Sequence, residues 1–244
     1  MENFADSYRA VVVGATGGLG AAFTRHLAAD PRCVGVHALS RSGRGEAGDK
    51  VVPGRVDILD EESVAAAAGA VGESGTPAFV IVSTGYLHGP DAGPEKSWSH
   101  ITADGLARNF AINTTGPALV AKHFLPLMPR KERGVFAALS ARVGSISDNG
   151  IGGWYGYRAS KAALNQVLKC LAIEGARKRP GLVVAGLQPG TVRTGLSEPF
   201  RGHVRAEDLF EPDTAAGHLL GVLDRLGPEQ SGRVFDWAGS EVPP

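Results

Sequence analysis

The feature that most constrains the fold of this chain is a regular alternation of short apolar runs with longer helical stretches. Runs that are apolar at nearly every position occur at 10–13, 34–39, 51–56, 78–82, 135–139, 182–187 and 233–237. Segments with a helical apolar period occupy 19–29, 61–71, 101–128, 154–177 and 214–226. Continuous apolar runs suit strands that are buried on both faces, as in parallel sheets. The alternation predicts an α/β fold: a doubly wound parallel sheet of about seven strands with helices on both faces.

Composition limits the classes of protein to which the chain can belong. Of its 244 residues 43% are hydrophobic and 20% are charged, which is typical of a globular core-forming protein. Its 25 Lys and Arg residues balance 25 Asp and Glu residues, so a nucleic-acid partner is not expected. No apolar run approaches the ~18 residues of a membrane span, and no secretory leader is visible. Two distant cysteines, Cys33 and Cys170, fit a reducing compartment, and we expect a cytoplasmic protein without a membrane partner.

The chain shows no linker-like change of composition, no low-complexity tract and no internal repeat. We therefore expect residues 1–244 to form a single domain. The stretch 195–212 between two predicted elements resembles a loop that closes over a bound substrate. The seven histidines lack the spacing of a metal-binding motif, so no metal is expected.

The first apolar run leads directly into a glycine-rich turn. Residues 14–20 read Gly-Ala-Thr-Gly-Gly-Leu-Gly and open the first helical stretch. At such a place glycine lets the backbone approach a pyrophosphate, and the helix start offers free N–H groups and a partial positive charge. Tight turns also use glycine for steric reasons alone. The position between a strand and a helix favours a dinucleotide site of the Rossmann type, formed by Gly14, Thr16, Gly17, Gly18, Leu19 and Gly20.

The end of the second run distinguishes between the two nicotinamide dinucleotides. An acidic residue here would favour NAD, whereas an arginine accommodates the 2′-phosphate of NADP. The chain has Ser40 and Arg41, with no acid before Glu46, which predicts NADP(H) over NAD(H). One arginine alone is commonly a solvated loop residue. After the third run, Asp57 with Ile58 beside it is placed to accept from the adenine amino group, or else to begin the next helix.

Two residues suited to acid–base chemistry begin the helical stretch at 154–177. Tyr157 and Lys161 are four residues apart and share one helix face. A phenol has a pKa near 10, and a neighbouring ammonium should lower that pKa by stabilising the phenolate. Tyr155 has no cation four residues further on. The pair is commonly an ordinary helix surface, but together with the glycine-rich turn it predicts a catalytic site.

In combination these motifs resemble the short-chain dehydrogenase/reductase family, over essentially the whole chain. The family carries TGxxxGxG, NNAG, a helical Asn, Ser, YxxxK and PGxVxT in this order. Here the first motif keeps its three glycines but has Val13 for the family's Thr, and Tyr157 and Lys161 match YxxxK. Within the family, Trp154 and the stretches 144–146, 157–161 and 235–237 are most similar to C-factor-like and sniffer-like carbonyl reductases.

The resemblance implies a role for each remaining motif. Asn113 would hold a water beside Lys161 and extend a proton relay, while Lys161 would bind the nicotinamide ribose. The segment after the fourth run reads Ser83, Thr84 and Gly85 in place of Asn-Asn-Ala-Gly, so the first Asn, which stabilises the sheet, is absent. The nicotinamide carboxamide would be held by Pro189, Gly190, Val192 and Thr194. The implied reaction is hydride transfer between NADP(H) and a carbonyl or alcohol, in a homodimer or homotetramer.

One departure from the family touches the chemistry. With Gly144 as the register point, Ala141 stands where the family has its catalytic Ser, and Ser140 lies one place early. The hydroxyl at this place polarises the substrate carbonyl. Adjacent strand residues face opposite ways, so Ser140 can replace it only if the strand end is irregular. Ser145 is a second candidate and Tyr157 acting alone a third; we predict Ser140.

Two other functions compete with the reductase. A dinucleotide-binding signalling or regulatory protein with little turnover is favoured by Ala141 and by the C-factor resemblance. A cofactor-free lyase similar to the halohydrin dehalogenases is weakly supported, since those proteins lose the glycine-rich loop and replace the Lys with Arg. Gly14, Gly18, Gly20 and Lys161 are all present here.

Overall fold

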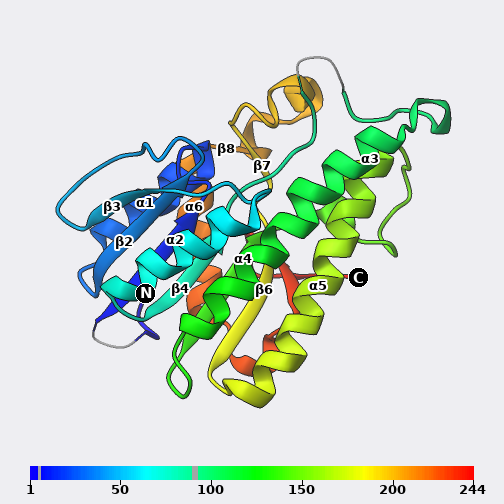
Figure 1. Ribbon diagram of the computed structural model, residues 1–244. Coiled ribbons are helices and arrows are strands. Elements are labelled where there is room, and N and C mark those ends of the chain that lie inside the picture. The colour runs from blue at the N-terminus through cyan, green and yellow to red at the C-terminus, as the bar shows by residue number, and fades with distance from the viewer. Residues whose placement is uncertain (5–6, 90–92) are drawn as a thin grey trace.

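The structure, a computed structural model, describes residues 1–4, 7–89 and 93–244, with only the backbone of His203. A sheet runs through the middle of the molecule (Figure 1). It has eight strands in the order β10-β9-β6-β5-β4-β1-β2-β3. The strands are β1 (Tyr8–Val13), β2 (Cys33–Ser40), β3 (Val51–Arg55), β4 (Pro77–Val82), β5 (Gly134–Leu139), β6 (Leu182–Gln188), β9 (Arg233–Asp236) and β10 (Glu241–Val242). All neighbours pair in parallel except β10, which is antiparallel to β9.

The predicted doubly wound fold is confirmed, and the strand number needs a correction. All seven apolar runs form strands of this sheet, but the sheet has eight strands rather than seven. The additional strand, β10, is only two residues long and pairs through Glu241 and Val242. So short a strand produces no apolar run, which is why the sequence pattern did not reveal it.

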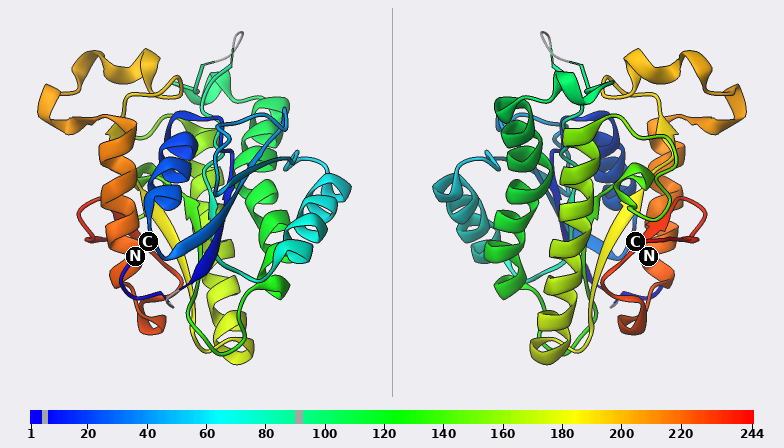
Figure 2. Two further views of the ribbon diagram at one scale, coloured as in Figure 1. Left: turned by 90° about the vertical axis from the view of Figure 1, so that its left-hand side faces the viewer. Right: turned by 90° about the vertical axis from the view of Figure 1, so that its right-hand side faces the viewer.

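Helices cover both faces of the sheet (Figures 1 and 2). One apolar cluster packs α1 (Gly18–Ala29) and α6 (Pro212–Arg225) on one face. A second cluster packs α2 (Glu61–Ser74), α4 (Gly116–Phe124) and α5 (Tyr155–Lys178) on the other. Strand residues alternate between the two clusters, for example Val12 in the first and Val11 in the second. The sheet is therefore buried on both faces, as the continuous apolar runs predicted.

The predicted helical stretch 101–128 is divided into several pieces. A short 3-10 turn η1 (Trp98–His100) precedes α3 (Ala103–Phe110), and a π-helical turn η2 (Ala111–Thr115) leads into α4 and η3 (Leu125–Leu127). In the π turn the backbone N–H of Gly116 donates to the carbonyl oxygen of Ala111. Such wider turns are frequent at functional sites, and this one contains Asn113.

Topology places the functional residues at one end of the sheet. β1 lies between β2 and β4, so the chain winds away from β1 in both directions and leaves a crevice at the carboxyl ends of these strands. A small parallel pair, β7 (Thr191–Val192) with β8 (Leu209–Phe210), and the turns η5 (Glu198–His203) and η6 (Ala206–Asp208) stand at the same end (Figure 2). The remaining turns are η4 (Arg142–Gly144) and η7 (Pro228–Gln230).

Candidate active site

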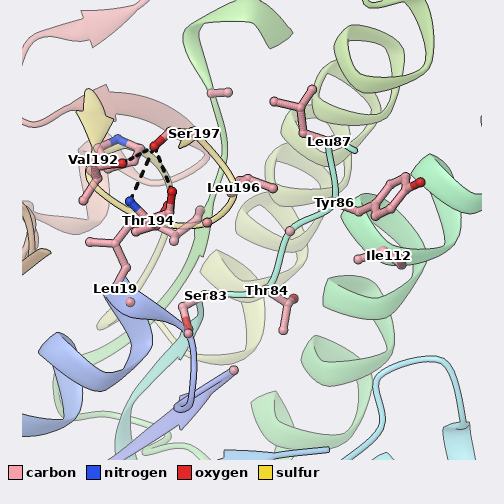
Figure 3. A pocket seen from close by; sticks show the side chains of 18 of the residues that line it. Leu19, Ser83, Thr84, Tyr86, Leu87, Ile112, Val192, Thr194, Leu196 and Ser197 are labelled. Carbon is pink, nitrogen blue, oxygen red and sulfur yellow. Dashed lines mark hydrogen bonds between the residues drawn. The ribbon is translucent and has the colours of Figure 1, made fainter. Parts of the chain in front are cut away.

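A cavity of about 760 Å³ opens at the carboxyl ends of the strands. Its lining brings together the turn after β1, the ends of β2, β4, β5 and β6, and the start of α5 (Figure 3). It contains every predicted cofactor-binding and catalytic residue except two, Gly20 and Asn113, which lie behind the wall. Residues from distant parts of the sequence thus form one site, at the topological switch point where ligands bind in such sheets.

The glycine-rich turn is shaped by close backbone contacts. Gly14 has a φ of +89°, which residues with a Cβ rarely adopt. A Cβ on Gly20 would lie 2.1 Å from the carbonyl oxygen of Gly14, and a Cβ on Gly18 would lie 2.7 Å from Cγ2 of Thr194. No side chain caps the start of α1 at Gly17. The first N–H groups of α1 therefore face the cavity free for an anion.

The residues after β4, which pack against this turn, also fit a dinucleotide. Among the described residues, Thr84 Oγ1 is a buried hydroxyl oxygen without a hydrogen-bond partner, a group that a ligand in the cavity would satisfy. Ser83 Oγ donates to the carbonyl oxygen of Val13 at 2.8 Å and ties β4 to β1. Ser83 therefore supplies a bond between these strands although the family's first Asn is absent.

An arginine follows β2 at the rim of the cavity. This residue, Arg41, is exposed and lies beside Ser40. Glu46 is the next acid along the chain, and its carboxylate is bound to Arg25 of α1 at 2.8 Å. The rim near Arg41 thus suits a phosphate better than a ribose hydroxyl that needs a carboxylate acceptor.

Asp57 lines the same end of the cavity and does not cap a helix. Its Oδ1 accepts from the backbone N–H of Leu59 at 3.0 Å. The cap of α2 is Asp60, whose side chain accepts from the N–H groups of Glu62 and Ser63. The alternative role considered for Asp57, the start of the next helix, thus belongs to Asp60.

Tyr157 and Lys161 are both buried in the cavity wall, with exposed fractions of 8% and 2%. Lys161 Nζ lies 5.7 Å from the centre of the Tyr157 ring and donates to the carbonyl oxygen of Leu139 at 2.8 Å. Burial raises the pKa of Tyr157 to about 12 and lowers the pKa of Lys161 to about 7. The expected lowering of the tyrosine pKa is thus reversed, because desolvation by burial disfavours both charged forms. Tyr157 keeps its proton at neutral pH.

Asn113 connects the end of β4 to the start of α5. Its Oδ1 accepts from the backbone N–H of Tyr86, and its Nδ2 donates to the carbonyl oxygen of Tyr86, both at 2.8 Å. Nδ2 also lies 3.0 Å from Ser160 Oγ, which donates to the carbonyl oxygen of Tyr157. The side chain fixes the backbone around Tyr157, and its place in a proton relay stays a prediction.

The residues after β5 bring both Ser140 and Ala141 to the cavity. Ala141 is the residue that the motif comparison puts at the family's serine position, which stays a prediction. Ser140 also lines the cavity, but its hydroxyl donates to Asn165 Oδ1 at 2.6 Å. Ser145, the second candidate, lies outside the cavity lining and accepts from the N–H of Asp148. To polarise a substrate, Ser140 must release Asn165, so its catalytic role stays a prediction.

An aromatic group covers the end of the cavity near Tyr157. Trp154 has a left-handed backbone, with φ of 52°, and its ring lies 6.3 Å from that of Tyr157 and 5.0 Å from that of Phe200. His88 stacks edge-on against Phe200 at 5.6 Å. Its Nε2 lies 3.2 Å from the carbonyl oxygens of Gly195 and Leu196, so this nitrogen carries the proton. These contacts hold the stretch 195–203 over the cavity.

Sequence reasoning missed Ser197, which fixes the beginning of this stretch. Its hydroxyl donates to the carbonyl oxygens of Val192 and Thr194 (Figure 3). It also accepts from Arg201 Nε at 3.0 Å. A serine three residues after PGxVxT is the only sequence sign of this contact. Ser197 thus orients the segment predicted to hold the nicotinamide.

Two further observations concern the described residues as a whole. They contain no group of three or more His, Cys, Asp or Glu side chains placed to bind a metal ion. None of their helices has the length and apolar character that crossing a bilayer would require.

The fold and the site define a dinucleotide-binding α/β protein with a Tyr–Lys pair. The sequence model of the short chain dehydrogenase family matches residues 8–204. The chain belongs to the short-chain dehydrogenase/reductase family and is an oxidoreductase of that family, as the motifs predicted.

Relatives and solved structures agree with this assignment. The C-signal protein of Myxococcus xanthus is 40% identical over 139 residues, 57% of this chain and 78% of the relative. The 1-hydroxy-2-glutathionyl-2-methyl-3-butene dehydrogenase of a Rhodococcus species is 35% identical over 188 residues, 77% of each chain. The NADPH-bound carbonyl reductase from chicken fatty liver shares the fold, with a TM-score of 0.84 at 24% identity over 97% of this chain and 94% of the other.

The sniffer carbonyl reductase of D. melanogaster shares the fold as well, with a TM-score of 0.80 at 19% identity over 98% of this chain and 99% of the other. These likenesses confirm the expected similarity to the C-factor-like and sniffer-like members.

Proposed function

We propose that this protein is an NADP(H)-dependent oxidoreductase that reduces a carbonyl group, or oxidises the corresponding alcohol, on a small molecule. The observation that carries the proposal is the buried Tyr157–Lys161 pair in the wall of a cavity whose other end is the glycine-rich turn. Bound NADP(H) would supply the hydride at its nicotinamide ring.

The chain's own residues then bind, orient and move the proton. The N–H groups at the start of α1 bind the pyrophosphate, and the segment 189–194, whose Thr194 lies beside Gly18, holds the nicotinamide end. Tyr157 is neutral, with its pKa raised to about 12, and donates its proton to the alkoxide oxygen as it forms. Lys161 binds the ribose hydroxyls, and Asn113 keeps its proposed place in the path that returns the proton.

Polarisation of the carbonyl rests mainly on Tyr157. Ala141 offers only a methyl group at the family's serine position. Ser140 contributes a second donor when its hydroxyl turns from Asn165 Oδ1 toward the substrate. An enzyme that lacks one such donor is expected to be slower by about 100-fold or more.

The preference for NADP(H) is supported by Arg41 at the rim and by the engagement of Glu46 with Arg25. A short-chain dehydrogenase/reductase of Burkholderia multivorans with bound NADP has a TM-score of 0.79 at 25% identity, over 97% of this chain and 99% of the other. Both findings point to the 2′-phosphate form of the cofactor.

Apolar side chains form part of the cavity lining, and the stretch 195–212 acts as its lid in a single-domain protein. The apolar set includes Leu87, Val143, Trp154, Leu196 and Phe200, and the same lining contains Tyr86, Arg108 and Arg142. Such walls suit an apolar group next to the reacting carbonyl. Assembly as a homodimer or homotetramer and a cytoplasmic location are further expectations from the family resemblance.

A second candidate is a dinucleotide-binding signalling protein with little turnover. Ala141 at the serine position and the 40% identity to the C-signal protein favour it. It predicts tight NADP(H) binding together with no activity that depends on Tyr157.

The test is the consumption of NADPH in the presence of a panel of aldehydes, ketones and diketones, with Tyr157→Phe alongside. We expect wild-type turnover, and a loss of about 100- to 10,000-fold in the variant with unchanged NADPH affinity. Tyr155→Phe is the matched control. Tyr155 lies in the same first turn of α5, separated from Tyr157 only by Gly156, and the residue four positions after it is Ala159 rather than a lysine. NADPH binding without turnover on any substrate would favour the signalling protein.

A further inference from the structure

Helix α5, which carries Tyr157 and Lys161, begins without a cap of its own. Trp154 occupies its N-cap position in a left-handed conformation and makes no side-chain hydrogen bond to the first turn. The first turn contains no acidic residue. A helix of 24 residues leaves free N–H groups and a partial positive charge at this end. A buried end of this kind requires partners from elsewhere.

Glu95, from the segment before η1, supplies these partners. Its Oε2 accepts from the backbone N–H of Gly156 at 3.2 Å, and its carbonyl oxygen accepts from the N–H of Trp154 at 2.5 Å. The residue is only 8% exposed. The ion pairs of the described residues do not include it. The carboxylate is therefore balanced by the positive end of α5 rather than by a cationic side chain.

The fit of this carboxylate depends on a glycine and reaches the catalytic network. A Cβ on Gly156 would lie 2.9 Å from Glu95 Oε1 and 2.9 Å from Asn109 Nδ2. Asn109 Oδ1 in turn lies 3.3 Å from Asn113 Nδ2. Asn113 bonds to Ser160, which donates to the carbonyl oxygen of Tyr157. Glu95 thus adjoins the same buried polar network that fixes the backbone of Tyr157.

The contact of Glu95 with Trp154 also sets the substrate end of the cavity. The Trp154 ring lies against Tyr157 and Phe200. Trp154 is a non-glycine residue in the left-handed region, where its surroundings must hold it. The hydrogen bond from its N–H to the backbone carbonyl oxygen of Glu95 is one such restraint.

We propose that Glu95 is a positioning residue that anchors the start of α5 and so places Tyr157 and Trp154 at the substrate end of the cavity. Glu95 lies outside the cavity lining and acts through Gly156 and Trp154. The catalytic consequence rests on the proposed function, whereas the anchoring of Trp154 does not.

The test combines Trp154 fluorescence with kinetics. Trp98 and Trp237 are replaced by Phe, so that Trp154 is the remaining indole. Both replaced side chains are exposed, Trp98 at 79% and Trp237 at 37%. Glu95→Ala and Glu95→Gln are compared in this background for emission and anisotropy, NADPH affinity, kcat and KM. Glu62→Ala is the matched control, because Glu62 is an exposed acid in the first turn of α2, where Asp60 already caps the helix.

We expect Glu95→Ala to shift the Trp154 emission, to lower its anisotropy and to reduce kcat at least tenfold, with NADPH affinity changed less than twofold. Glu95→Gln keeps an acceptor for the Gly156 N–H and should recover most of both readouts. Wild-type emission and kcat in Glu95→Ala would overturn the proposal, as would an equal loss in Glu62→Ala or a parallel loss of NADPH affinity.

If Glu95→Ala does not fold, Glu95→Asp decides, because its carboxylate is one methylene too short for Gly156. It should then show the altered emission and reduced kcat, and wild-type behaviour would overturn the proposal. If the wild-type protein turns over no substrate, the proposed function fails, and the emission of Trp154 still tests the anchor by itself.

Discussion

Helices α1 and α5 begin at the same cavity, and neither carries a capping side chain at its own N-cap residue. At α1 the chain leaves the end open, since Gly17 and Gly18 have no side chains that could cover the N–H groups. At α5 the protein fills the end with Glu95, which is contributed from a distant segment. Both ends present the same partial positive charge.

The two N-terminal ends differ in whether another group of the protein already occupies them, and this decides which of them can bind a ligand. An open end with glycines around it can accept an external anion, such as a pyrophosphate. A filled end cannot accept one and instead holds the helix in place. The first arrangement suits binding and the second suits positioning, and Tyr157, the proposed catalytic residue, follows the second.

The largest expected effect is a loss of NADPH affinity when a side chain fills the open N-terminal end of α1. In Gly17→Asp the carboxylate would cap the first turn of α1, as Glu95 caps α5, and repel the pyrophosphate. The backbone at Gly17, with φ of −74°, accepts any residue. We expect NADPH affinity to fall about 100-fold, measured by cofactor fluorescence, with unfolding stability unchanged or higher. Gly17→Asn caps without charge and should lose much less; equal losses would contradict an electrostatic role for the open end.

Placing a serine at position 141 should raise kcat. Ala141→Ser places a hydroxyl where the lining now has a methyl group, and we expect kcat to rise about 100-fold with NADPH affinity unchanged. Steady-state kinetics on the best substrate of the panel measures this. Ser140→Ala is the companion variant, and a loss of kcat there would show that Ser140 leaves Asn165 during turnover. No gain in Ala141→Ser would mean that Tyr157 already polarises the carbonyl fully.

The rim of the cofactor half offers a smaller effect. Arg41→Asp should lower the affinity for NADPH relative to NADH about tenfold, because it replaces a guanidinium by a charge that repels the 2′-phosphate. Titration of both cofactors gives the ratio. Arg44→Asp, at a neighbouring exposed position outside the cavity lining, serves as the control. An unchanged ratio in Arg41→Asp would remove the case for NADP(H) preference.

The burial of Lys161 should make the stability of the protein depend on pH. Its pKa is lowered to about 7, so between pH 7 and pH 10 the unfolded chain holds a proton that the folded chain lacks. The free energy of unfolding should therefore rise with pH over this range, relative to that of Lys161→Met. Urea unfolding at pH 7, 8 and 9 measures the difference. Exposed Lys169→Met should run parallel to the wild type, and a constant difference for Lys161→Met would contradict the buried neutral lysine.

The same two helix ends show how far the sequence could predict the structure. The strands were visible because burial on both faces makes whole runs apolar, and the open end of α1 because its glycines are adjacent in sequence. Glu95 was not visible, since it lies sixty-one residues from Gly156 and no local pattern connects them. One sign was present: α5 begins with Trp and Tyr rather than with a capping residue, so another segment had to satisfy its N–H groups.

Other details were missed for similar reasons. The π turn at Asn113 and the pairing of Ser140 with Asn165 arise from packing between distant elements, which single residues do not signal. The pKa of Tyr157 was predicted in the wrong direction, because the spacing of Tyr157 and Lys161 is visible in the sequence but the burial of both groups is not. The short strand β10 left no apolar run to detect.

Hydride transfer at this site is tested most directly by following deuterium from C4 of NADPH into the product alcohol. NADPH carrying deuterium at both C4 positions is incubated with the protein and the carbonyl compound that consumes it fastest, and the product alcohol is examined by mass spectrometry. We expect one deuterium on the carbinol carbon of the product, with product formation lost in Tyr157→Phe and retained in Tyr155→Phe. Oxidation of NADPH that leaves no deuterium in the alcohol, or equal product from Tyr157→Phe, would contradict hydride transfer at this site.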